Sequence, residues 1–497
     1  MNTLQLLLNG FVTALQPMNL IFALVGSLVG TLIGVLPGIG PSAATAILIP
    51  LTFALDPTGA IIMLAAIYYG AMYGGTITSI LINVPGEAAS AITCLDGYQM
   101  SKNGRAGAAL TIAAVGSFVG GCVSVAALVL VALPLSSLAL KFGPPEFFAL
   151  MLIGMTMVTG LAGRSINRAL LSAVFGLLVA MIGMDPVQGG PRFTFGNVNL
   201  LSGVNIVPVI MGLFGIGEIL TNLESPNKQV FNSKIGPLMP TREEWRRSIG
   251  PIGRGTGIGL FLGLIPGIGT MIPTFISYFV EKKVSKTPEK FGSGMIEGIA
   301  GPETANNSYA NGAIIPLFTL GIPASPTLAI LMGGLMMNGL LPGPLLFTEH
   351  SNFVWAVIAS FVIGNLILLI LNLPLIPMWV SVLKLPYSVL FTFILGFAVM
   401  GAYTVDNNIF GVIVMLAFSL IGYVFRKLDI PVAPFALTLI LGPMMEKALR
   451  QSLEMSNGSF QIFFSRPLTA VLIVVAFIII VINSTKFLTL VKADSEI

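Results

Sequence analysis

Two short glycine-rich motifs interrupt strongly apolar stretches of this sequence, and their residue types are suited to binding an anion. The first contains Pro37-Gly38-Ile39-Gly40 and the second contains Pro266-Gly267-Ile268-Gly269. A helix broken at such a motif exposes main-chain N–H groups and the partial positive charge of a helix N-terminus, which suit a carboxylate. Glycine lets a ligand approach the backbone closely. The chemistry that these motifs favour is therefore non-covalent anion binding.

The two motifs belong to a longer internal repeat. Each is preceded by three glycines at four-residue intervals, and the second copy begins 229 positions after the first (Gly26 to Gly255). A second interruption follows in each half, at 83–86 and at 321–325. Helices broken at corresponding places in two apolar halves are typical of the binding site of a membrane transporter. For the spaced glycines, a surface for close helix packing is the other interpretation.

Polar residues gather around all four interruptions, and their hydroxyl and amide groups can bind a carboxylate or coordinate a hard cation such as Na⁺. The predicted substrate-binding residues are Gly38, Gly40, Ser42, Thr45, Asn83, Gly86, Gly267, Gly269, Thr270, Asn306, Asn307, Pro323 and Ser325. The predicted cation-binding residues are Thr76, Ser79, Asn311 and Thr319. Helix capping is an alternative role for Asn306 and Asn307.

Two acidic residues, Glu87 and Glu303, lie nearest the interruptions. A carboxylate within a membrane is a functional candidate by default, and a solvated position at the membrane surface is the alternative. No lysine or arginine occurs between residues 1 and 101 or between 291 and 383. We therefore expect helix dipoles and a bound cation, rather than a basic side chain, to neutralise an anionic substrate.

The elements that position these residues must cross a membrane. The chain has 497 residues, of which 55% are hydrophobic and only 9% charged, whereas soluble domains carry about 25% charged residues. Several apolar runs, such as 354–373, are long enough to span roughly 30 Å of hydrocarbon. We expect an all-α polytopic membrane protein with about 10–12 transmembrane segments, preceded by an amphipathic helix over residues 2–16.

The basic residues indicate how the second motif is threaded. Arg254 precedes it and Lys282-Lys283 follow it, and basic flanks are typical of the cytoplasmic side. Since both flanks have the same charge, a re-entrant hairpin over 255–281 is expected, with a straight, kinked span as the alternative. The first motif has no basic flank, so its hairpin is expected to enter from the opposite face. Together these features predict an inverted repeat.

This threading divides the chain into three parts. Residues 1–221 form the first membrane repeat, with a hairpin near 20–54 and a broken helix near 59–100. Residues 222–254 form a cytoplasmic linker. Residues 255–497 form the second membrane repeat, with the hairpin 255–281 and a broken helix near 305–340, and scaffold helices complete each repeat.

Enzyme chemistry finds little support in the composition. One histidine and two separated cysteines leave no metal-ligating cluster beyond a possible Na⁺ site, and no phosphate-binding loop of the kind that ATP-driven pumps use is present. We predict that the protein is not an enzyme and needs no cofactor.

Several segments together resemble the large membrane subunit of the tripartite tricarboxylate transporters. They are Gly30–Pro41, Tyr69–Thr76, Asn83–Glu87, Gly301–Asn307 and Gly321–Ser325. The resemblance extends over nearly the whole chain. One departure is Ala324, which follows Pro323 where the family pattern has glycine, so that this tip is bulkier.

The resemblance implies a bacterial inner-membrane secondary transporter that takes up tricarboxylates or related carboxylates with a gradient of Na⁺ or H⁺. It also implies two partners: a small membrane subunit of about four helices and a periplasmic solute-binding protein. An elevator-like motion is similar to that of other inverted-repeat carboxylate carriers. The alternative function is a stand-alone carrier or channel for another organic anion.

Overall fold

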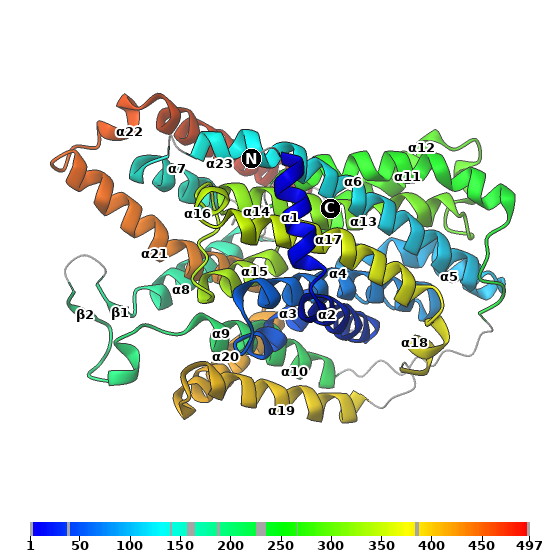
Figure 1. Cartoon of the computed structure of the whole chain (residues 1–497), viewed down its shortest axis with the longest axis horizontal. Coiled ribbons are helices and arrows are strands. Elements are labelled where there is room, and N and C mark those ends of the chain that lie inside the picture. Colours follow the sequence, from blue (N-terminus) through cyan, green and yellow to red (C-terminus); the bar gives the residue numbers. More distant parts are fainter. Residues whose placement is uncertain are drawn as a thin grey trace.

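The computed structural model describes residues 3–36, 40–139, 142–156, 165–185, 189–224, 235–265, 267–382 and 387–494. Within these ranges almost all regular structure is helical (Figure 1). The strands assigned there are β1 (Gly183–Met184) and β2 (Pro191–Arg192), which pair antiparallel with Gly183 opposite Arg192.

Six helices among the described residues are long and apolar enough to cross a membrane. They are α2 (Pro17–Val35), α4 (Pro57–Ile82), α6 (Ala106–Ala139), α17 (Ser351–Asn372), α20 (Ile409–Lys427) and α21 (Val432–Met455). Shorter apolar helices accompany them. These helices confirm the all-α polytopic membrane class, whereas the predicted number of passes stays a prediction.

Two helices, α4 and α13 (Glu297–Gly312), form the centre of the fold (Figure 1). Every residue of α4 from Gly59 to Ile82 is buried, and so is every residue of α13 after Glu297. A helix that faced lipid would expose an apolar side. Since neither helix does so, both are enclosed by other helices of the same chain.

The spaced glycines bring a neighbouring helix against each central helix. A Cβ atom on Gly30 of α2 would lie 2.4 Å from the Ile67 carbonyl oxygen of α4. A Cβ atom on Gly259 of α11 (Arg242–Gly263) would lie 2.3 Å from the Ala305 carbonyl oxygen of α13. The structure therefore supports the packing interpretation, because no larger residue allows backbones to approach so closely.

The same contacts show that the repeat extends beyond the motifs. Gly26 meets Met63, and Gly255 meets Gly301. The two glycines are 229 positions apart and their two partners are 238 apart. The first and second interruptions of the second half are likewise nine residues further apart along the chain than those of the first half. Each half therefore repeats a pair of helices, while the inverted threading across the membrane stays a prediction.

Each motif is followed by a second, shorter arm. In the first half these are α3 (Pro41–Leu48) and η1 (Ile49–Thr52), and in the second half the arm is α12 (Met271–Val284). Arg254 donates from Nε to Glu281 Oε1 at 2.8 Å. This ion pair joins α11 to α12 at the ends predicted for the hairpin 255–281. We call residues 17–52 hairpin 1 and residues 254–284 hairpin 2.

Helix α11 begins at Arg242, inside the segment predicted as a linker. The cause is a capping box, in which the Thr241 hydroxyl accepts from the Glu244 N–H and the Glu244 carboxylate accepts from the Thr241 N–H. Such a box satisfies two main-chain donors at a helix start. Residues 225–234 of the predicted linker lie outside the described residues.

The second interruptions share their backbone conformation. Helix α4 ends at Asn83 with φ 57° and ψ 30°, and α14 (Ile314–Leu320) ends at Gly321 with φ 70° and ψ 25°. Four residues later, Glu87 and Ser325 both adopt an extended conformation and begin η2 (Ala88–Ala91) and α15 (Pro326–Met337). The broken helix of the second half starts at Glu297, whereas it was predicted near 305–340. In this half, α13 and α14 together correspond to α4 of the first half.

One side chain anchors hairpin 2 to the first half. Asp96, on α5 (Thr93–Lys102), accepts hydrogen bonds from the N–H groups of Gly292, Gly294 and Met295 at 2.7–2.9 Å. Its other oxygen accepts from the Tyr278 hydroxyl of α12 at 2.8 Å. Asp96 is fully buried, so this contact fixes the segment after hairpin 2 against α5.

The remaining helices surround this centre. The predicted N-terminal helix is present as α1 (Thr3–Ala14) and packs on α17, where a Cβ atom on Gly10 would lie 2.3 Å from the Trp355 carbonyl oxygen. The others are α7 (Pro144–Thr156), α8 (Ile166–Ala180), η3 (Val198–Leu200), α9 (Ile206–Ile210), the π-helix η4 (Met211–Ile216), α10 (Gly217–Glu224), η5 (Pro288–Lys290), α16 (Leu346–Glu349), α18 (Ile376–Val382), α19 (Tyr387–Asp406), α22 (Ile462–Ser465) and α23 (Pro467–Asp494).

The packing of α11 on α13 predicts opposite effects for two alanine substitutions on one helix. Gly259→Ala should lower the melting temperature of the detergent-purified protein, because overpacking typically costs about 1–3 kcal/mol. Gly257→Ala is the control, since a Cβ atom there meets nothing within 4 Å, and alanine favours a helix by roughly 0.5–1 kcal/mol. Equal melting temperatures for the two variants would contradict the packing assignment.

Candidate binding site

The start of α3 lies against the start of α15, so the motif of the first half adjoins the second interruption of the other half. The Ser42 and Thr327 hydroxyls are hydrogen-bonded at 2.9 Å. Each belongs to the first turn of its helix, and both helices begin with proline at their first position. Two helix N-termini therefore lie side by side, and the partial positive charge of such ends favours an anion.

The motif of the second half also lies near the second interruption at 321–325. Gly267 and Gly269 have φ angles of 79° and 76°, which favour glycine. The Gly269 main chain lies beside the Tyr309 hydroxyl, and that hydroxyl donates to the Ala324 carbonyl oxygen at 2.9 Å. Both motifs therefore adjoin residues 321–327. Pro37, Gly38, Ile39 and Pro266 lie outside the described residues.

A carboxylate of the protein itself lies at the motif of the first half. Glu218 Oε1 would be 3.8 Å from a Cβ atom on Gly40, and the Gly40 main chain interacts with this carboxylate. The other Glu218 oxygen faces the Arg426 guanidinium at 3.4 Å. The backbone at Gly40 is thus next to a carboxylate of the protein itself, and its predicted role in substrate binding stays a prediction.

Helix α13 supplies buried polar groups between the interruptions. Asn306 Nδ2 donates to Glu87 Oε1 at 2.7 Å. Glu303 Oε2 accepts from the Thr76 hydroxyl at 2.6 Å, and its other oxygen accepts from the Thr93 hydroxyl. Glu87 and Glu303 are 7% and 1% exposed. Both carboxyl groups are therefore inside the protein and not at a solvated surface.

Several buried oxygen atoms near these carboxyl groups have no hydrogen-bond partner among the described residues. They are Asn306 Oδ1, Asn307 Oδ1, Asn311 Oδ1 and the hydroxyls of Tyr68, Tyr69 and Tyr73. Tyr68 lies close to Glu87 and Tyr73 lies close to Glu303. Buried polar groups normally have partners, so this cluster is suited to a polar ligand or a cation.

Other predicted site residues bind main-chain atoms of their own helices or loops. The hydroxyls of Thr45, Ser79 and Thr319 donate to the carbonyl oxygens of Pro41, Gly75 and Ile315 respectively, and Asn311 Nδ2 donates to the Asn307 carbonyl oxygen. Ser325 caps α15, Thr270 precedes α12, and Pro323 is buried. Gly86 packs against Gly75, and Asn83 is exposed at the end of α4.

Four polar residues around this centre were missed in the sequence analysis. Tyr73, Thr93, Ser117 and Tyr309 contact or adjoin predicted site residues. Tyr73 lies inside the segment Tyr69–Thr76, and Tyr309 lies two residues after the segment Gly301–Asn307. Both are in a helix between two interruptions, and that position could have identified them. Thr93 and Ser117 come from α5 and α6, where no local pattern marks them.

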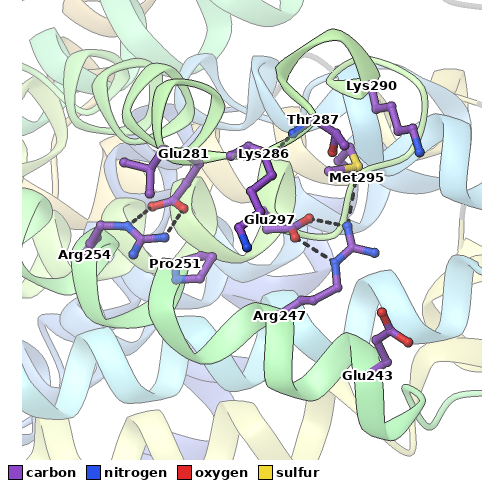
Figure 2. A pocket seen from close by; sticks show the side chains of 12 residues that line it. Glu243, Arg247, Pro251, Arg254, Glu281, Lys286, Thr287, Lys290, Met295 and Glu297 are labelled. Carbon is purple, nitrogen blue, oxygen red and sulfur yellow. Dashed lines mark hydrogen bonds and ion pairs between the residues drawn. The ribbon is translucent and has the colours of Figure 1, made fainter.

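A separate charged pocket of about 450 Å³ lies at the open end of hairpin 2 (Figure 2). Arg247 and Arg254 line it, and each is held by a carboxylate, from Glu297 at 2.7 Å and from Glu281 at 2.5 Å. Because both guanidinium groups already have acidic partners, this pocket is a weaker candidate for a carboxylate substrate than the helix ends at the centre.

The fold defines a multi-pass membrane protein with buried polar groups at its centre. Comparison with known proteins gives the family. Residues 20–437 match the model of the tripartite tricarboxylate transporter TctA family. This chain belongs to that family, which is a family of transporters.

Two relatives come from Agrobacterium vitis. The chain is 46% identical over 474 residues, covering 95% of its own length and 94% of the relative, to a protein described as an uncharacterized 52.8 kDa protein in the TAR-I ttuC' 3' region. It is 44% identical over 215 residues, covering 43% of its own length and 89% of the relative, to an uncharacterized protein in the TAR-II ttuC' 3' region. No solved structure matches the chain.

The contact between Glu87 and Asn306 predicts a rescue between two substitutions. Asn306→Asp should lower the melting temperature, because it places a second carboxyl group against a buried one, and losing such a hydrogen bond costs about 1–3 kcal/mol. Adding Glu87→Gln restores one carboxyl and one amide group and should recover most of the loss. Additive losses in the double variant, measured by thermal unfolding in detergent, would show that the two side chains do not interact.

Proposed function

We propose that this protein is the large permease subunit of a three-component, cation-coupled importer of tricarboxylates or related carboxylates in the bacterial inner membrane. Its partners are a small membrane subunit of about four helices and a periplasmic binding protein that delivers the substrate. Membership of the TctA family supports the transporter class and the large-subunit role. The identity of the carboxylate, the coupling to a cation and the two partner proteins are parts of the proposal that the family match does not supply.

The observation that carries the proposal is the meeting of two helix N-termini beside central helices that have no basic side chain. The starts of α3 and α15 are linked through Ser42 and Thr327, and the central helices α4 and α13 contain no lysine or arginine. Helix N-termini attract carboxylates through N–H groups and the helix dipole. A site of this kind binds an anion without a fixed positive charge, so that the anion is released more easily than from an arginine.

A cation is expected to accompany the anion for electrostatic reasons. Glu87 and Glu303 already lie at the centre and are close enough to repel each other when both are charged. A multiply charged carboxylate brought beside them raises the negative charge further. Binding of Na⁺ or H⁺ in the same state offsets that charge, which couples the two solutes.

Uptake by reconstituted vesicles tests the function directly. The three components are combined in vesicles, and the entry of radiolabelled citrate and of dicarboxylates is followed with and without an inward Na⁺ gradient. We expect uptake only when all three components and the gradient are present. Equal uptake by this chain alone would contradict the three-component function, and equal uptake without any cation gradient would contradict coupling.

The buried turn at Gly267 predicts a variant without transport. Gly267→Val should abolish uptake while leaving membrane insertion largely intact, because valine is strained at a φ of 79° and reshapes the motif beside the site. Gly458→Val is the matched control. Gly458 also has a positive φ, of 86°, but lies in an exposed turn after α21. Equal uptake by both variants would exclude this turn from the site.

A further inference from the structure

A small cavity lies beside Glu303, and it shares Tyr73, Thr76 and Ser117 with the centre described above. Its volume is about 10 Å³, close to the smallest space that holds one water molecule. Its polar lining comes from three helices: Tyr73 and Thr76 of α4, Ser117 of α6 and Asn372 at the end of α17. The rest of the lining is apolar (Ile77, Leu110, Ala113 and Ala114).

The oxygen atoms of this cavity are available as ligands. The hydrogen of the Thr76 hydroxyl goes to Glu303 Oε2 at 2.6 Å, which leaves the oxygen lone pairs for another partner. Asn372 Nδ2 donates to the Leu368 carbonyl oxygen at 2.9 Å, while Asn372 Oδ1 has no partner among the described residues. The Tyr73 hydroxyl, also buried, has none either.

Ser117 connects the cavity to the central helix. Its hydroxyl accepts from Asn307 Nδ2 at 2.7 Å and lies 3.3 Å from the Glu303 carbonyl oxygen, to which it donates. Through Thr76 and Ser117 the cavity is therefore joined at two points to the turn of α13 that contains Glu303. Any charge inside the cavity acts directly on that carboxyl group.

Glu303 has no cationic side chain as a partner among the described residues. On the helices that pack against α13, Arg247 and Arg254 are paired with Glu297 and Glu281. The other cations on these helices, all exposed, are Lys102, Arg242, Arg246, Lys282 and Lys283. The nearby ionisable groups are Glu87, Tyr73 and Cys94, none of which supplies a positive charge. A buried carboxylate without a countercharge is costly.

We propose that this cavity binds one Na⁺ ion, with Thr76, Ser117, Asn372 and Tyr73 supplying oxygen ligands and Glu303 supplying the countercharge. The inference rests on the proposed cation coupling for its role and on the cavity for its location. Hard cations prefer oxygen ligands, and the lining residues include three hydroxyl side chains and one amide but no basic group. Of the predicted cation-binding residues, it includes Thr76 and omits Ser79, Asn311 and Thr319.

Binding of Na⁺ alone, without any carboxylate, tests this inference. The melting temperature of the detergent-purified full chain is measured as NaCl replaces KCl at constant ionic strength, and ²²Na⁺ binding is measured in parallel. We expect Na⁺-specific stabilisation of the wild type. Asn372→Leu should weaken the apparent Na⁺ affinity at least tenfold, and Glu303→Gln should do the same.

Asn365→Leu is the matched control. Asn365 lies on the same helix two turns earlier, is equally buried, donates to the Phe361 carbonyl oxygen and also leaves its Oδ1 without a partner among the described residues. It does not line the cavity, so Asn365→Leu should retain wild-type Na⁺ affinity. If Asn372→Leu fails to fold, Ser117→Ala replaces it, with the same expected loss.

Three results would overturn the site. They are equal stabilisation by Na⁺ and K⁺, unchanged Na⁺ affinity in Asn372→Leu or Ser117→Ala, and equal losses in those variants and in Asn365→Leu. The first would mean that the cavity holds only water. Failure of the proposed function is separable, because Na⁺ binding that depends on Asn372 without any carboxylate uptake would support the site and reject the importer.

Discussion

The close backbone contact between the glycine-bearing helices and the central helices determines where every other part of the site lies. At Gly30 and Gly259 the neighbouring carbonyl oxygen occupies the space that a side chain would need. These close contacts pack α2 against α4 in the first half and α11 against α13 in the second half. Gly40 and Gly269, which follow these helices, both lie near residues 324–327.

Broken helices within a membrane protein need burial, because their free N–H and C=O groups find no water in hydrocarbon. Here each motif lies next to the second interruption of the second half, as the Ser42–Thr327 and Tyr309–Ala324 hydrogen bonds show. The unpaired groups therefore face other protein groups or a bound solute instead of lipid. The same arrangement explains why polar residues on α13 are tolerated: they lie inside a shell of helices that the glycines hold together.

Much of this fold was predictable from the sequence, because its main signals are local. Apolar length predicted the membrane helices, and the repeated glycines predicted both the packing surfaces and the interruptions. The start of α11 was predictable as well, since Thr241 and Glu244 form a recognisable capping box. The flanking charges Arg254 and Lys282-Lys283 mark the hairpin 255–281, whereas the cap marks where the helix begins.

The cavity beside Glu303 was not predictable in the same way. Tyr73, Ser117 and Asn372 come from three helices far apart in the chain, and nothing in the local sequence of α17 distinguishes Asn372 from Asn365. Asn372 lines the cavity and Asn365 does not, because the two turns of α17 pack against different parts of the neighbouring helices. Some of the predicted polar residues, such as Thr319, donate their hydroxyl hydrogen to a carbonyl oxygen of their own helix. The residue type alone does not reveal this hydrogen bond.

The buried Asp96 carboxylate has a consequence for motion. It holds the segment that follows hairpin 2 by three main-chain N–H groups and holds α12 by Tyr278. Hairpin 2 therefore cannot move away from α5 without breaking hydrogen bonds to the buried Asp96 carboxylate. A rearrangement that preserves these bonds moves α5, α12 and residues 292–295 together.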